Sequence, residues 1–243
     1  MSDTSSCLVL DVENQRWEKN VIGETTMIRW GHAAVSVENV GTYLIGGAGV
    51  SNMRDTTDFL ASGVTEWTAG PGLPVTMKYP CAVQITQFSF LAIHGNDIRE
   101  YQVDVANPTS SSGWQEANKW PSLQTSRTEC GCALTADNKV VIAGGFLRNH
   151  GYLKSSEVLD LATRKITNGG DMTSPRSLFH LATITLDGDT NIFAISGSNA
   201  FAFVDVEEFR KETNSWTLAP TTLGEVRHGF GRVVVEVETI CPI

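Results

Sequence analysis

The chain has 243 residues, of which 41% are hydrophobic, and its formal net charge is −9. This length is enough for one all-β domain with a sizeable core. The acidic balance argues against nucleic acid as a general partner. There is no apolar run of about 18 residues, which argues against a membrane-spanning helix.

The cysteines and the N-terminus bear on the compartment. The chain contains Cys7, Cys81, Cys130, Cys132 and Cys241, an odd and sparse set that does not resemble a disulfide framework. Buried thiols in a reducing, cytoplasmic compartment explain such a set. The N-terminus lacks the basic start and long apolar core of a signal peptide. The mature part of a secreted precursor is the alternative.

Residues 1–20 read as half of a repeating unit. LVLDVENQRW resembles VLDLATRKI (158–166) and EFRKETNSW (208–216), so it predicts the third and fourth strands of a unit. The matching first half lies at the other end, where RHGFGRVVVEVE (227–238) resembles RWGHAAVSVE (29–38). We therefore expect the two termini to share one unit, joined by strand pairing. If the short segment TICPI forms its second strand, Cys241 would lie beside Cys7.

The first whole unit spans residues 29–77. RWGHAAVSVENVGTYLIGG predicts two apolar strands that end at Gly46-Gly47, and TDFLASGVTEW predicts a third strand with Phe59 and a fourth with Trp67. Similar units follow at 78–126, 127–175 and 176–226. Two longer polar loops, at 105–113 and 146–156, are expected on the surface.

Three markers repeat with a common period of about 50 residues. The basic marker comprises Arg29, Lys78, Arg127, Arg176 and Arg227. The glycine marker comprises Gly46-Gly47, Gly95, Gly144-Gly145 and Gly197. The bulky closing marker comprises Trp17, Trp67, Trp114, Ile166 and Trp216. A period of this length is typical of solenoids, propellers and repeat arrays.

Apolar residues, a glycine pair, an aromatic residue and then a tryptophan, repeated at this period, resemble the kelch repeat. The resemblance covers nearly the whole chain. It implies a single all-β domain over residues 1–243, a kelch-type β-propeller of about five four-stranded blades, one of them shared between the termini. A six-bladed or truncated propeller is the alternative. LAIHG, AISG and Ile166 depart from the repeat pattern.

The basic marker is the first candidate site. Equivalent positions in a ring lie on one face, so Arg29, Lys78, Arg127, Arg176 and Arg227 would surround one end of the central channel. Arginine offers a planar fork to carboxylates and phosphates. In the kelch domains of ubiquitin-ligase adaptors, arginines at this place help to hold an acidic peptide, and the resemblance carries that role to the four arginines. The alternative is structural: each basic residue pairs with a loop carboxylate of the neighbouring blade.

Histidines and cysteines supply two further candidates. His32, His180 and His228 lie within four residues of the basic marker, but at different offsets, which disfavours a shared metal site. Cys130 and Cys132 face one side of a strand. Cys81 holds the same offset as Cys130 in the preceding unit, so the two are expected to be neighbours along the channel wall. Small residues packing around a narrow channel explain the cysteines better than a metal does.

Two function classes follow. By resemblance, the first is a protein–protein interaction module that presents the basic ring and blade loops to a protein or acidic peptide, as an adaptor or scaffold. The alternative is a small sugar-acting enzyme, a mutarotase or isomerase at the channel mouth. We expect no cofactor, metal or catalytic residue for the binding module, and a monomer.

Overall fold

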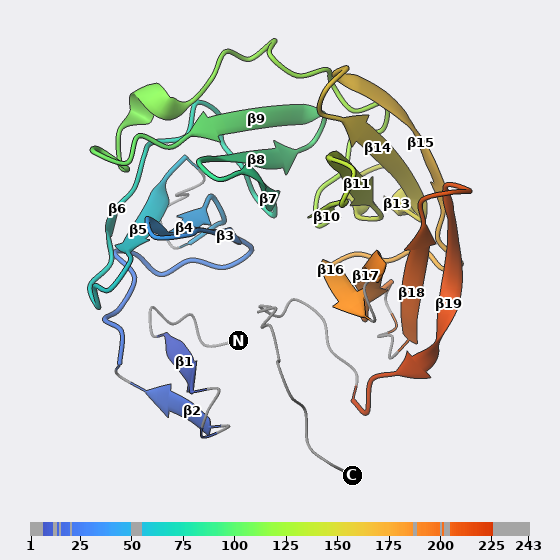
Figure 1. Ribbon diagram of the computed structural model, residues 1–243, viewed down its shortest axis with the longest axis horizontal. Coiled ribbons are helices and arrows are strands. Elements are labelled where there is room, and N and C mark those ends of the chain that lie inside the picture. Colours follow the sequence, from blue (N-terminus) through green and yellow to red (C-terminus); the bar gives the residue numbers. More distant parts are fainter. Residues whose placement is uncertain are drawn as a thin grey trace.

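Four antiparallel β-sheets stand around a common centre in the computed structural model (Figure 1). The structure describes residues 7–11, 14, 16–19, 21–49, 55–186, 189–199, 201 and 205–225. Within these residues the helical content is one 3-10 turn, Ser111–Gly113. The arrangement is therefore an all-β propeller with four described blades.

Each blade is a meander in which consecutive strands pair, so strand order in the sheet follows order in the chain. Blade 1 comprises β3 (Ala33–Val37), β4 (Gly41–Ile45), β5 (Thr57–Ala61) and β6 (Thr68–Ala69). Blade 2 comprises β7 (Cys81–Thr86), β8 (Ser89–His94) and β9 (Asp97–Gln102). Blade 3 comprises β10 (Gly131–Leu134), β11 (Lys139–Ala143), β14 (Ser155–Asp160) and β15 (Lys165–Asp171). Blade 4 comprises β16 (His180–Leu186), β17 (Asp189–Ile195), β18 (Asp205–Arg210) and β19 (Ser215–Thr222).

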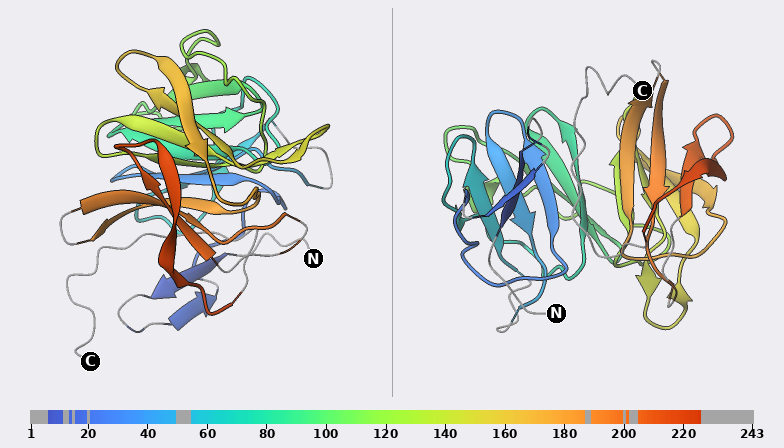
Figure 2. Two further views of the ribbon diagram at one scale, coloured as in Figure 1. Left: turned by 90° about the vertical axis from the view of Figure 1, so that its right-hand side faces the viewer. Right: turned by 90° about the horizontal axis from the view of Figure 1, so that it is seen from below.

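Two small hairpins accompany the blades. Strands β1 (Leu8–Asp11) and β2 (Arg16–Lys19) pair antiparallel, as predicted for the third and fourth strands of a unit. Strands β12 (Phe146–Leu147) and β13 (Gly151–Tyr152) form a hairpin that projects from blade 3 (Figure 2). The predicted first half of the terminal blade, 227–238, lies outside the described residues, as do Arg227, His228 and Cys241.

Blade 2 departs from the four-stranded pattern. In place of a fourth strand it has a single bridge between Tyr101 and Trp114. The predicted long loop lies between these residues, and buried tyrosine side chains form hydrogen bonds with its backbone. The Tyr101 hydroxyl donates to the carbonyls of Pro108 at 2.9 Å and Ser110 at 2.8 Å. The Tyr43 hydroxyl of blade 1 donates to the same Pro108 carbonyl at 2.9 Å, so the loop also joins two blades.

Three apolar layers fill the spaces between consecutive blades. Alternate side chains of a strand point to opposite faces, so one strand can serve two layers. On β11, Val140 and Ile142 pack toward blade 2, whereas Val141 and Ala143 pack toward blade 4. The near-continuous apolar run of this central strand follows from its burial on both faces.

One closing tryptophan, Trp216, lies between sheets, as its size predicts. Trp216 of β19 is buried, and its indole N–H donates to Ser156 Oγ of blade 3 at 3.1 Å. Where blade 3 has Ile166, Trp120 from the preceding linker packs into the same layer and donates to Glu100 Oε2 at 2.9 Å. Trp17 on β2 is 63% exposed.

The innermost connection between blades is a relay of backbone hydrogen bonds. Tyr79 N–H donates to Gly31 O at 2.8 Å, Glu129 N–H to Tyr79 O at 3.1 Å, and Leu178 N–H to Glu129 O at 3.1 Å. All four residues have a positive φ, between 53° and 62°. These four positions are therefore structurally equivalent. They show which residues of the four blades correspond to one another, without reference to side-chain type.

The glycine marker reflects close backbone approach. A Cβ on Gly145, whose φ is +100°, would lie 2.5 Å from the carbonyl oxygen of Thr128. Gly151 has a φ of +83°, but nothing lies within 4 Å of its Cβ position. A substitution at Gly151 would therefore meet only an unfavourable backbone conformation. A substitution at Gly145 would meet the same unfavourable conformation and a steric clash.

We expect Gly145→Ala to lower the free energy of unfolding by about 3 kcal/mol or more, because it adds overpacking against a backbone oxygen to a strained φ. Gly151→Ala should cost only about 1 kcal/mol, for its φ alone. Urea unfolding followed by tryptophan fluorescence measures both. Equal losses in the two variants would contradict the close-approach explanation.

Candidate functional site

The three described arginines of the basic marker are buried inside their own blades. Arg127 Nη1 donates to the carbonyls of Gly144 at 2.8 Å and Ser155 at 2.9 Å. Arg29 repeats this with Gly46 at 2.9 Å and Thr56 at 3.2 Å, and Arg176 donates to Ser196 O at 3.0 Å. Each guanidinium therefore binds a backbone carbonyl at the end of the second strand of its blade. In blades 1 and 3 it also binds a carbonyl at the start of the third strand.

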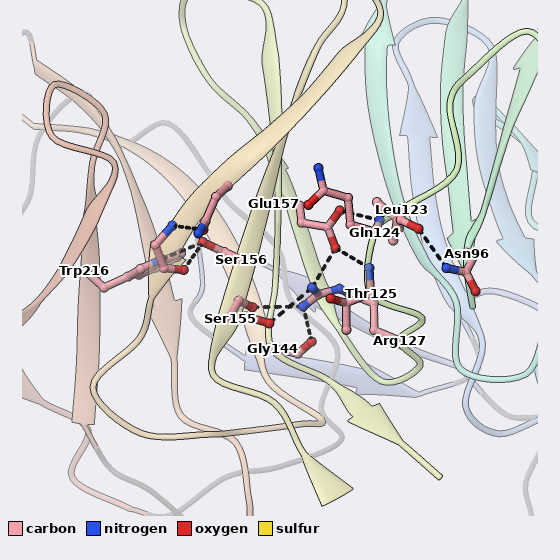
Figure 3. Close-up of polar contacts among 12 residues, drawn as sticks. Asn96, Leu123, Gln124, Thr125, Arg127, Gly144, Ser155, Ser156, Glu157 and Trp216 are labelled. Carbon is pink, nitrogen blue, oxygen red and sulfur yellow. Dashed lines mark hydrogen bonds and ion pairs between the residues drawn. The ribbon is translucent and has the colours of Figure 1, made fainter. Parts of the chain in front are cut away.

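Each of these arginines also has a buried carboxylate partner. Arg127 Nη2 lies 2.9 Å from Glu157 Oε1 (Figure 3), and Arg29 Nη2 lies 3.0 Å from Asp58 Oδ1. Arg176 pairs with Glu207 in the same way and contacts Asp205 at 3.2 Å. The carboxylates lie on β5, β14 and β18, the third strand of the same sheet. The structural alternative predicted a loop carboxylate of the neighbouring blade, so the partner exists but its location differs.

The carboxylates also bind the segment that connects the blades. Glu157 accepts the backbone N–H groups of Gln124 at 2.7 Å and Thr125 at 3.0 Å (Figure 3), and Glu207 accepts that of Thr173 at 2.7 Å. Buried charges need partners of this kind to offset their loss of hydration. The Arg127 and Arg176 pairs therefore join strand ends and linkers within the protein, and both arginines are fully buried.

Lys78 does not occupy the arginine position of blade 2. The relay places Tyr79 beside Gly31, Glu129 and Leu178, so the residue two positions earlier is the equivalent one, and that is Met77. Met77 is fully buried, and its carbonyl accepts the Gly47 N–H at 2.8 Å, as the Arg176 carbonyl accepts that of Gly145. Lys78 was matched to the arginines in the sequence because basic residues were counted at equal steps. The structure shows that Lys78 is one residue after the equivalent position.

The acidic position of blade 2 has changed together with the arginine position. Glu157 lies opposite Ile142, and the corresponding residue opposite Ala92 is Arg99. Blade 2 therefore has a methionine where the other blades have an arginine, and an arginine where they have a carboxylate. Among its described residues, blade 2 therefore lacks both the arginine and the carboxylate of the buried ion pair, so no carboxylate is left there without its arginine.

Lys78 instead takes part in an aromatic cluster at the end of the blades. Its Nζ lies 4.5 Å from the ring centroid of Trp30 and 5.2 Å from that of Tyr79. The two rings are 5.5 Å apart, and Trp30 is 38% exposed. We call Trp30, Lys78 and Tyr79 the rim cluster. Sequence reasoning missed the aromatic members because neither belongs to the repeat pattern, although Trp30 stands out as a tryptophan away from the closing position.

The hairpin β12–β13 leaves blade 3 at the same end. Thr128 and Ser177 hold the place in blades 3 and 4 that Trp30 holds in blade 1, and Thr128 bridges to Phe146 as Trp30 bridges to Ala48. The hairpin carries exposed Arg148 and His150, with Tyr152 37% exposed. The predicted 146–156 loop therefore extends the surface on which the rim cluster lies.

The predicted histidines occupy different environments. His32 is exposed at its surface, yet desolvation by the protein packed around the imidazole, and to a smaller extent the charge of Arg29, lowers the pKa of His32 to about 4. His180 begins β16 and pairs with Ile195 across the sheet, while His228 lies outside the described residues. Over the described ranges, no three His, Cys, Asp or Glu side chains are grouped to hold a metal ion.

The predicted proximity of Cys81 and Cys130 is found. Their sulfur atoms are 3.5 Å apart, and Cys132 is buried in the same apolar layer between blades 2 and 3. All four described cysteines are free thiols. Cys7, the fourth, lies apart from this layer in the N-terminal segment.

A hollow of about 320 Å³ lies on blade 1, lined by residues of the β3–β4 turn and by Leu60–Val64 after the middle of β5. None of the predicted site residues lines it. Among the helices of the described segments, none is long and apolar enough to cross a membrane.

Comparison of the sequence with models of known protein families gave no match. Comparison with curated proteins gave no sequence of significant similarity. The function is therefore inferred from the residues and contacts of this chain.

We expect Arg127→Met, which copies the residue found in blade 2, to lower the free energy of unfolding by about 3–5 kcal/mol, because Glu157 keeps a buried charge without its partner. Adding Glu157→Gln should recover part of this loss, since the unpaired charge is removed and the amide oxygen can still accept one of the two linker N–H groups. Urea unfolding of both single variants and the double variant gives the coupling energy. Strictly additive losses would show that the pair does not act as a unit.

The lowered pKa of His32 predicts acid sensitivity. Its folded-state pKa of about 4 lies below the ordinary value of 6.5, so the unfolded chain binds the proton more readily. Stability should fall as pH drops from 6.5 toward 4, and solvent screening of this exposed side chain makes the loss smaller than a fully buried imidazole would give. Relative to His32→Gln, the wild type should lose more stability over that interval. His150→Gln, on the exposed hairpin, is the control, and identical pH profiles for wild type and His32→Gln would contradict the assignment.

Proposed function

We propose that this chain is a protein-binding module, built as a kelch-type β-propeller, which holds a protein or acidic peptide on the rim cluster and the neighbouring β12–β13 hairpin. The spacing of the repeats and their glycine and tryptophan markers support the kelch type. They also support a fifth blade formed by β1–β2 and residues 227–243. Free thiols fit a cytoplasmic setting.

The observation that carries the proposal is the rim cluster itself. Trp30 presents 38% of its surface to solvent, and Lys78 stacks on it. Large exposed aromatic residues beside a cation are typical of the residues that contribute most binding energy at protein interfaces. Gly31 makes the cluster possible, because a Cβ there would lie 2.5 Å from the Tyr79 ring.

The charge of the rim suits an acidic partner. The protein as a whole is acidic, yet this end carries Lys78 and Arg148, while Arg29, Arg127 and Arg176 are engaged by internal carboxylates. Complementary charge would guide an acidic segment to this end and raise its rate of association. The same internal engagement removes the arginines that a sugar isomerase would use, so the described residues favour binding over that alternative.

The experiment is selection of peptides from a displayed random library, followed by affinity measurement of the enriched sequences. We expect enriched acidic peptides to bind wild type and to lose at least tenfold in affinity on Lys78→Glu or Trp30→Ala, as expected for central interface residues. Raising the salt concentration should also weaken binding.

Two matched variants serve as controls. Lys139→Glu makes the same charge change on an exposed lysine paired with Asp137 beyond the β10–β11 turn, away from the rim. Trp17→Ala removes an exposed tryptophan on β2. Peptides that bind all four variants alike, or a library that yields no acidic enrichment, would overturn the proposal.

A further inference from the structure

Two thiols from neighbouring blades lie in direct contact between the inner strands. Cys81 begins β7 of blade 2, and Cys130 immediately precedes β10 of blade 3. Their sulfur atoms are 3.5 Å apart, and β7 and β10 are adjacent strands of the ring. A disulfide needs the sulfurs to approach to about 2.05 Å, and the two sulfurs are already in contact.

The two thiols differ in their readiness to ionise. Burial raises the pKa of Cys81, whereas the contact with Cys81 lowers the pKa of Cys130, and the charge of Arg127 acts in the same direction. The thiolate is the nucleophilic form of cysteine. Because the two sulfurs are 3.5 Å apart and Cys130 follows Arg127 by three residues, we assign the attacking role to Cys130 and the resolving role to Cys81.

We propose that Cys81 and Cys130 form a reversible disulfide that links blade 2 to blade 3 when the protein meets hydrogen peroxide. The Cys130 thiolate attacks one peroxide oxygen, the O–O bond breaks, and the departing hydroxide takes up a proton to leave as water. The resulting sulfenic acid is attacked by the Cys81 sulfur, the S–O bond breaks, and the Cys81 proton leaves in a second water. Two thiols are oxidised and one peroxide is reduced to two waters.

Cys132 is the competing thiol. It lies two residues after Cys130 on the same face of the strand and is 4% exposed, against 6% for Cys130 and 7% for Cys81. Cys132 also interacts with Cys81 and contributes to raising the pKa of Cys81, but the direct sulfur–sulfur contact of 3.5 Å joins Cys81 to Cys130. The geometry therefore assigns the bond to the Cys81–Cys130 pair.

The disulfide would act on the rim without being part of it. Tyr79 precedes Cys81 by two residues, Glu129 precedes Cys130 by one, and Glu129 N–H donates to Tyr79 O at 3.1 Å. A covalent bond directly behind this hydrogen bond would hold the two segments together. This inference does not depend on the proposed function, since it concerns only the thiols.

The test is treatment of the folded, reduced protein with hydrogen peroxide, followed by alkylation and peptide mapping by mass spectrometry. We expect a Cys81–Cys130 linked peptide that dithiothreitol removes, and slower hydrogen exchange at the Glu129 amide in the oxidised protein. Mapping the wild type needs no substitution, so a variant that fails to fold does not affect the result.

Variants then assign the partners. Cys81→Ala and Cys130→Ala should each abolish the cross-link, whereas Cys132→Ala and Cys7→Ala should retain it. A link between Cys81 and Cys132, oxidation confined to Cys7, or sulfinic acid at Cys130 without any cross-link would each overturn the proposal.

Discussion

The structure depends on face-to-face stacking of sheets that cannot cover their own apolar surfaces. Blades 2 and 3 bury one face against the preceding blade and the other against the next, whereas blades 1 and 4 each contribute one face to the three described layers. Aromatic rings of Tyr43, Phe90 and Tyr101 fill the first layer, thiols and branched aliphatic side chains fill the second, and Phe179, Phe209 and Trp216 fill the third. The backbone relay and the buried ion pairs act within this stack and hold the inner strands in register.

Much of the fold could be predicted from sequence because its determinants are local. Alternating strands and turns, the glycine pair and the closing tryptophan each reflect a constraint within one unit, so their repetition was visible without coordinates. The proximity of Cys81 and Cys130 was predicted from their equal offset from Lys78 and Arg127, but the relay shows that Cys81 is equivalent to Gly131, so the two thiols are close although their positions differ by one residue.

The candidate site was less predictable, for a physical reason. Whether an arginine faces solvent or its own sheet depends on a carboxylate about 30 residues later, and Asp58, Glu157 and Glu207 became recognisable as partners only through strand register. Blade 2 concealed the pattern further. Met77 is apolar and Lys78 beside it is basic, so counting charges selected the wrong residue, and only the positive φ of Tyr79 restores the alignment.

The direction of the backbone relay has a consequence for how the ring assembles. From Gly31 to Leu178, each blade offers a carbonyl that receives an N–H of the next, so a docked blade presents a ready acceptor to its successor. Growth by addition of neighbouring units, each templated by the previous one, is the behaviour expected of arrays whose contacts are confined to nearest neighbours. Such a chain can begin ordering at its N-terminal blades while later ones are still being synthesised.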